Sequence, residues 1–273
     1  MKEERNALQE RVFPALRDLC RRHGCRFQAV DLRWGVREEA GLDQQTMKIC
    51  LGEIERCQRI TPRPNFIILL GDRYGWQPLP AEIPADEFEA VLEAAGETGS
   101  DLLRRWYLRD DNAVPPVYGL RPRQPGLAEG AEEEDRRRAL DEESREWSSV
   151  EERLRRALRT AVAGLDLPAG KRLKYAASAT EQEIEAGALK IEDAEKHVFA
   201  FFRSIEGLPR DGSGGAFVDH GPPEDVAESA RGLENLKDRL RSRLKENVHE
   251  YVAVWRQGSV STDHLEPFCE DVR

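Results

Sequence analysis

Apolar positions along the first 70 residues alternate between helical spacing and short unbroken runs. Residues 4–22 carry leucine, valine and alanine side chains three or four positions apart with charged residues between them, which predicts an amphipathic helix. Residues 27–32 form a short apolar segment that predicts a strand, and residues 47–57 return to helical spacing before two prolines. Residues 66–70, Phe-Ile-Ile-Leu-Leu, are the kind of run that fills a strand buried on both faces of a parallel sheet.

The same alternation returns towards the end of the chain. The spacing predicts a helix over residues 180–191, a strand over 198–202, a leucine-rich helix over 233–244 and a last strand over 251–255. Helices that alternate with apolar strands are typical of a parallel sheet flanked by helices. The predicted fold class is therefore α/β.

Residues 79–175 interrupt this alternation. They hold several prolines, a highly charged stretch that predicts a solvated helix or an unstructured loop, and then an amphipathic helix. Residues 114–118 predict a short edge strand, because two prolines would keep it out of the centre of a sheet. We interpret residues 79–175 as a helical, charged insertion within an α/β domain of residues 1–256, and residues 257–273 as a linker.

Composition narrows the class of partner. The 273 residues carry a net charge of −10, which argues against nucleic acid and against anionic membranes as partners. The N-terminus is too charged for a signal peptide, and no apolar run approaches the ~20 residues that span a bilayer. The odd number of cysteines, five, is typical of reduced thiols. We therefore expect a cytoplasmic protein.

Several catalytic motifs are absent from the sequence. The nearest approach to a phosphate-binding loop, residues 164–171, has one intervening residue too many, and Arg172 stands where a hydroxyl is needed. The five histidines are scattered without metal-ligand spacing to any cysteine, so no metal site is expected. No Gly-x-Ser-x-Gly elbow occurs.

A candidate site follows from the predicted topology alone. Loops that leave parallel strands gather at one edge of the sheet, together with the N-termini of the following helices. Residues 31–36, 71–76 and 178–183 should meet there and form a nucleotide-sized pocket. The candidate binding residues are Asp31, Arg33, Trp34, Gly35, Gly71, Tyr74 and Trp76, and Glu183 is the candidate catalytic carboxylate.

Structural roles compete with this interpretation. The two tryptophans could plug the ends of the sheet instead of stacking on a ligand. Asp31 and Arg33 could pair with each other or with a helix end, and the glycines could serve turns. Glu183 fits a capping box with Thr180, whereas a cap at Ser178 would assign that role to Glu181. The sequence does not choose between the two caps.

Five blocks together resemble one family. They are Glu-Glu-Arg-Asn-Ala-Leu at 3–8, Asp-Leu-Arg-Trp-Gly-Val at 31–36, Glu-Ile-Glu-Arg-Cys at 53–57, the segment 66–76, and Ser-Ala-Thr-Glu-Gln-Glu-Ile at 178–184. The chain resembles the TIR-like domain, long a domain of unknown function, that precedes the NACHT ATPase of STAND proteins such as NACHT/WD-repeat, telomerase-associated and nephrocystin-like proteins. The resemblance implies a TIR/flavodoxin-like parallel sheet and a C-terminal NACHT module as partner.

The resemblance also exposes a difference. Family members begin with an apolar strand just before the block at residues 3–8, and this chain starts at that block. The family's first strand would lie in the centre of the sheet, so we expect a truncated or misassigned start that leaves two strands without partners.

Two functions are implied by the resemblance. The first is a signalling and assembly module, as in innate immunity, which the NACHT ATPase gathers and which then self-associates or recruits other TIR-like or effector domains. The alternative is a TIR-type NAD⁺ hydrolase that releases nicotinamide, with NAD as substrate and no cofactor. In that case Glu183 and Ile184 match the catalytic Glu-Ile pair, Trp34 stacks on a base, and the loop after Asp31 corresponds to the BB loop. We favour assembly, because capping offers Glu183 another role and the first strand is missing.

Overall fold

The computed structural model describes residues 1–32, 42–61, 63–123, 132–209 and 212–273. The chain divides into two compact units. The first unit comprises Met1–Leu32, Gly52–Gly75 and Glu183–Arg273, and the second comprises Arg33–Leu51 and Trp76–Gln182. Two helices run across these boundaries: α4 (Thr46–Ile60) and α9 (Ala179–Ile184). Within the described ranges, no helix combines the length and apolarity that crossing a bilayer would need.

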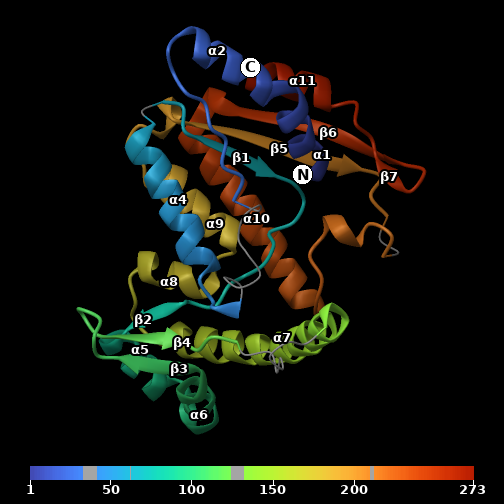
Figure 1. Cartoon of the computed structure of the whole chain (residues 1–273). Coiled ribbons are helices and arrows are strands. Elements are labelled where there is room, and N and C mark those ends of the chain that lie inside the picture. The colour runs from blue at the N-terminus through green and yellow to red at the C-terminus, as the bar shows by residue number, and fades with distance from the viewer. Residues whose placement is uncertain (33–41, 62, 124–131, 210–211) are drawn as a thin grey trace. The chain divides into compact units, whose positions relative to one another are not determined.

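The first unit is built on a sheet whose described strands have the order β1-β5-β6-β7 (Figure 1). β1 (Phe66–Leu70) pairs in parallel with β5 (Val198–Glu206), and β5 pairs in parallel with β6 (Val248–Arg256). The short β7 (Ser259–Val260) adds an antiparallel edge. This parallel pairing confirms the predicted α/β class.

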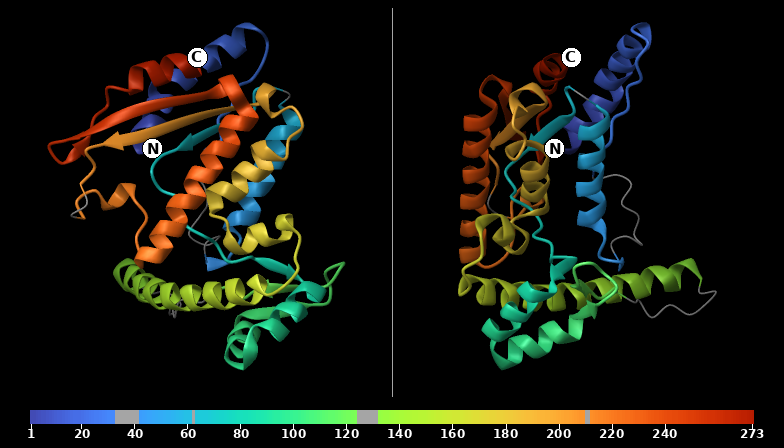
Figure 2. Two further views of the ribbon diagram at one scale, coloured as in Figure 1. Left: turned by 180° about the vertical axis from the view of Figure 1, so that it is seen from behind. Right: turned by 90° about the vertical axis from the view of Figure 1, so that its left-hand side faces the viewer.

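Helices cover both faces of this sheet. On one face, Ile68, Leu70 and Phe202 pack with Ile184 of α9 and with leucines of α10 (Pro223–Leu244). The left panel of Figure 2 shows α9 and α10 on the viewer's side of the strands. On the other face, Phe201 packs with α1 (Lys2–Ala7), a π-helical turn at Leu8–Val12, and α11 (Leu265–Val272). Successive strand residues alternate between the two cores, as the pleat requires.

The remaining elements of the first unit connect these layers. They are α2 (Phe13–Arg22), a π-helical turn at Glu185–Leu189, and three 3₁₀ turns at Ala194–Lys196, Gly215–Phe217 and Lys245–Asn247. The predicted helices over 4–22, 180–191 and 233–244 are thus present. Residues 257–273, expected as a linker, hold β7 and α11, and Phe268 and Cys269 of α11 are fully buried in the core.

The strand expected at residues 27–32 is wrong. In the structure these residues pair with no described strand, and Leu32 lies in a turn. β1 likewise pairs on one side only, because no described strand lies along its other edge. A strand needs a neighbour for its backbone groups, so an apolar run without one does not become a strand.

The second unit has a core of its own. β2 (Glu82–Pro84), β4 (Val117–Leu120) and β3 (Tyr107–Asp110) form an antiparallel sheet in the order β2-β4-β3. Around it pack four helices: α5 (Ala85–Ala94), α6 (Gly96–Trp106), α7 (Glu133–Ala163) and α8 (Ala169–Ala176). Phe88, Leu103 and Leu154 are fully buried there.

Two expectations about this region need correction or extension. The strand predicted at 114–118 exists as β4 but is central, because Pro115 and Pro116 lie just before it and leave the ladder positions to later residues. The charged stretch before Trp147 is the N-terminal part of α7. The unit also extends the predicted insertion at both ends and includes residues 33–51.

Candidate functional site at the carboxyl edge of the sheet

The loop that follows β1 is held by a carboxylate from the loop that follows β5. The backbone N–H groups of Tyr74 and Gly75 donate to the two carboxylate oxygens of Asp219 at 2.7 and 3.0 Å. Gly75 adopts φ +91°, a conformation that favours glycine, so the turn depends on this residue. Two adjacent N–H groups on one carboxylate form a small anion-binding turn, which the chain itself occupies.

Gly71 and Tyr74 are packed rather than open. A Cβ on Gly71 would lie 3.0 Å from the Nη2 atom of Arg203, so the missing side chain makes room for that guanidinium. Tyr74 is buried, and its ring lies 3.2 Å from where a Cβ on Gly232 of α10 would stand. Both residues lie at the predicted edge of the sheet, and both have a structural role there.

A buried charged cluster beside Gly71 escaped the sequence analysis. Glu4, Arg203 and His264 are each about 95% buried, or more. His264 Nε2 lies 2.9 Å from Glu4 Oε1, and Arg203 Nε lies 3.6 Å from the same oxygen. The spacing of Glu4 with Ala7 and Leu8 places it on the buried face of the first helix, which is a signal that could have revealed it.

The pKa values of two carboxyls at this edge shift in opposite directions. Burial alone would raise the pKa of Glu4, but the hydrogen bond from His264, the amino group of Met1 and Arg203 together lower the pKa to about 2. Burial raises the pKa of Asp72, one residue beyond Gly71, although Arg203 and Lys237 oppose this rise. The ionised Glu4, paired within the fold, stabilises it. Asp72 is the carboxyl at this edge that holds its proton more tightly than an ordinary aspartic acid.

The start of α9 resolves the choice between the two caps. The Ser178 hydroxyl accepts a hydrogen bond from the backbone N–H of Glu181 at 3.2 Å, so Ser178 is the capping residue. Glu181 then occupies the third helical position, which is the place of the acid in a capping box that starts at Ser178. Glu183 lies four residues before Gly187, where a Cβ would stand 2.6 Å from the ring of Phe66 at the start of β1.

The sequence analysis set a structural role for Asp31, pairing with Arg33 or with a helix end, against ligand binding. In the structure Asp31 has such a role, and its partner is Arg5. Its carboxylate lies 3.4 Å from Arg5 Nε on α1. The predicted site residues Arg33, Trp34 and Gly35 lie outside the described residues, so the structure does not place them.

Trp76 belongs to the second unit, whereas Asp31, Gly71, Tyr74 and Glu183 belong to the first. Its indole N–H donates to Glu151 on α7 at 2.8 Å, and 48% of the residue is exposed. A pocket shared by all eight predicted residues stays a prediction.

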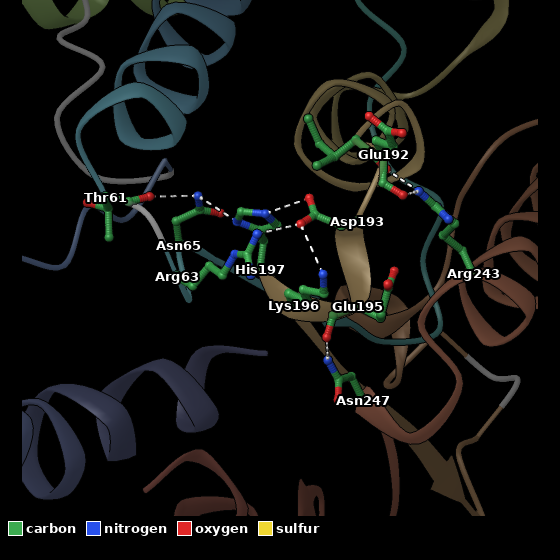
Figure 3. Close-up of polar contacts among 11 residues, drawn as sticks. Thr61, Arg63, Asn65, Glu192, Asp193, Glu195, Lys196, His197, Arg243 and Asn247 are labelled. Atoms are coloured by element: carbon green, nitrogen blue, oxygen red, sulfur yellow. Dashed lines mark hydrogen bonds and ion pairs between the residues drawn. The ribbon is translucent and has the colours of Figure 1, made fainter.

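A second polar cluster lies at the opposite, amino edge of the sheet (Figure 3). His197, just before β5, places Nε2 2.8 Å from Asp193 Oδ1 and Nδ1 3.4 Å from the Asn65 amide nitrogen. Since the amide nitrogen only donates, Nδ1 accepts and Nε2–H donates to Asp193. This bond from His197 lowers the pKa of Asp193, and Arg63 at 2.6 Å adds to the effect.

Both ring nitrogens of His197 are engaged, so the cluster clamps the two chain segments that enter β1 and β5. It presents no nucleophile. Across the described residues, no three His, Cys, Asp or Glu side chains gather as a metal would need.

Similarity to the known proteins named here extends over 31–76% of the chain. No protein-family model and no solved structure matches it. NACHT and WD repeat domain-containing protein 2 of Homo sapiens is 33% identical over 220 residues, covering 76% of this chain and 12% of that protein. NACHT domain- and WD repeat-containing protein 1 of Mus musculus is 42% identical over 135 residues, covering 49% of this chain and 9% of that protein.

The chain is homologous to a region of NACHT and WD repeat proteins. Telomerase protein component 1 of Rattus norvegicus is also similar, 37% identical over 84 residues that cover 31% of this chain and 3% of that protein. The chain spans about a tenth of the length of the NACHT and WD repeat relatives. These similarities fit this chain being a region of a NACHT-type protein. The TIR-like nature of the chain stays a prediction.

Proposed function

We propose that this chain is the N-terminal signalling and assembly module of a NACHT-type STAND protein and acts by self-association or by recruiting a partner. The relatives support the NACHT context. The structural observation that supports self-association of the 1–273 chain is the edge of β1 along which no described strand lies, since a second copy can pair there. The resemblance places the missing first strand in the centre of the same sheet, so this proposal concerns the chain as given.

The edge of β1 lacks the features that normally prevent strand pairing. Its residues Phe66–Leu70 include no charge, proline or bulge. Ile67 is 37% exposed, so an apolar side chain accompanies the unpaired backbone. In an antiparallel pair of two β1 strands, the absence of charge means that no like charges would face each other. Two copies could thus join their sheets through this edge.

Light scattering after size-exclusion chromatography, run over a concentration series, tests this proposal. We expect the mass to rise with concentration in the wild-type chain. Ile67→Lys places a charge on the edge and should keep the chain monomeric, since lysine on an edge strand blocks pairing. Val252→Lys is the control for adding a charge to an exposed apolar strand residue away from β1, because Val252 is 52% exposed on β6 and pairs with Ser204 of β5.

Strict monomers at every concentration would contradict the self-association proposal. Assembly that Ile67→Lys leaves unchanged would place the contact elsewhere. A monomer that instead captures one defined extended segment in trans would favour recruitment.

A second candidate function is NAD⁺ cleavage with Glu183 as the catalytic carboxylate. The observation that favours it is the cap at Ser178, which removes the capping explanation for Glu183. A carboxylate near the ribose stabilises the positive charge that builds as the nicotinamide bond breaks. Incubation with NAD should release nicotinamide, Glu183→Gln should abolish the release, and Glu224→Gln, on the exposed start of α10, should not. Full turnover by Glu183→Gln would exclude this role.

A further inference from the structure

The C-terminal turn of α2 brings two cysteines together. Cys25 N–H donates to the carbonyl of Cys20 at 2.8 Å, and Gly24 N–H donates to the carbonyl of Arg21 at 3.1 Å. Gly24 has φ +69°. These two bonds around a left-handed glycine define a Schellman motif, in which the residues at the positions of Cys20 and Cys25 characteristically touch.

The backbone bond alone limits how far apart these residues can be. With standard bond lengths on either side of a 2.8 Å N–H···O bond, the two Cα atoms lie within about 6.7 Å of each other. Disulfides join Cα atoms about 4.4–6.8 Å apart, so this Cα separation lies within the range that a bridge can span. Both thiols are free; Cys25 is exposed and Cys20 is partly exposed. The Cys25 Sγ lies 3.6 Å from the carbonyl oxygen of His23 and can turn about its Cα–Cβ bond.

We propose that Cys20 and Cys25 form a reversible, redox-responsive disulfide that locks the end of α2 to the segment that follows it. Of the other cysteines, Cys50 and Cys269 are buried, and Cys57 is partly exposed like Cys20 but lies in α4, away from this turn. Between the two cysteines lie Arg21, which is ion-paired with Asp18 at 3.0 Å, and Arg22, whose positive charge attracts an anionic oxidant.

The oxidant class is a low-molecular-weight disulfide such as oxidised glutathione. The Cys25 thiolate attacks one sulfur of that disulfide, breaks its S–S bond and releases one small thiol, which leaves a mixed disulfide on Cys25. The Cys20 thiolate then attacks the Cys25 sulfur and releases the second small thiol. The two cysteine protons end on the two released thiols, the cysteines are oxidised by two electrons, and the small disulfide is reduced by two.

The bridge would act on residues 25–32, which follow α2 and belong to no helix or strand. The Phe27 ring already packs on Phe13 of α2, with centroids 5.6 Å apart. Asp31, further along, pairs with Arg5. Oxidation would therefore fix the Cys25 end of residues 25–32, which is attached to the C-terminal turn of α2. It should slow hydrogen exchange in that segment.

The test equilibrates the 1–273 chain in glutathione buffers of graded composition, blocks free thiols by alkylation and digests with trypsin. Trypsin cuts after Arg21 and Arg22, so peptides holding Cys20 and Cys25 stay joined only by a disulfide. We expect this linked pair, while Cys57 takes up glutathione alone. Gly24→Ala should lower the equilibrium constant for the bridge by about fivefold or more, since alanine disfavours the left-handed conformation of the motif.

Separate glutathione adducts on Cys20 and Cys25, as on Cys57, would overturn the proposal. So would a bridge that forms equally well in the urea-unfolded chain and in Gly24→Ala, because the folded turn would then contribute nothing.

Discussion

Glu4 should be a major pH-dependent contributor to stability, and Glu4→Gln tests this. The pKa of its carboxyl falls from 4.5 to about 2 on folding. At about 1.4 kcal/mol for each tenfold change in acidity, this displacement corresponds to about 3 kcal/mol of unfolding free energy. Because the folded-state pKa lies below the unfolded-state value, the contribution is fully present above pH 4.5 and is lost as the pH falls towards 2. Urea unfolding at pH 7 should therefore show Glu4→Gln to be about 3 kcal/mol less stable than wild type.

The same comparison at pH 3 separates this explanation from a packing defect. The linkage relation leaves less than half of the difference at that pH, about 1.4 kcal/mol. Glu266→Gln is the matched control, because its carboxylate is mostly exposed and lies 3.4 Å from Arg11, so its effect should stay within about 0.5 kcal/mol at both pH values. A Glu4→Gln difference that is equal at pH 7 and pH 3, or that is below about 1 kcal/mol at pH 7, would refute the reasoning.

Three further substitutions test the packing and the loop contacts. Gly187→Ala would place a Cβ 2.6 Å from the Phe66 ring and should cost about 1–3 kcal/mol in urea unfolding, and Phe66→Leu in the same chain should recover part of that cost. Asp219→Ala removes the acceptor of two backbone N–H groups after β1, so hydrogen exchange of those two amides should accelerate by about tenfold or more, while the amides within β1 should be unaffected. Tyr175→Phe removes a 2.6 Å hydrogen bond to the buried Glu87 carboxylate and should cost about 2 kcal/mol in the second unit; a neutral result would mean that the neighbouring lysines satisfy the carboxylate by themselves.

The spacing of apolar residues correctly predicted the helices and strands that are strongly apolar or whose packing partners are near in the sequence. The run Phe66–Leu70 and the leucine stripe of α10 appear where they were predicted, because burial on one core fixes both. Residues 27–32 were wrongly predicted to form a strand, because strand formation depends on a neighbouring strand that the local sequence does not show. The central place of β4 was missed for the same reason.

The candidate site was predicted in its topology but not in its contacts. The loop after β1 does lie at the carboxyl edge of a parallel sheet, as alternation of helices and strands implies. Asp219, which binds that loop, stands far away in the sequence, so no local pattern could reveal it. The partners of Glu4 lie about 200 and 260 residues away, at Arg203 and His264. Long-range charge pairing of this kind is visible only once the chain is folded.

The way the chain passes back and forth between its two units constrains how the protein can be dissected. The polypeptide crosses the division after Leu32, Leu51, Gly75 and Gln182. A deletion of residues 76–182 would therefore leave residues 33–51 behind without the rest of the second unit. A single cut after Leu32 or Gln182 would divide the first unit, and a single cut after Leu51 or Gly75 would divide both units. To separate the first unit from the second, residues 33–51 and 76–182 must both be removed and two new junctions made. One of these junctions falls in the middle of helix α4.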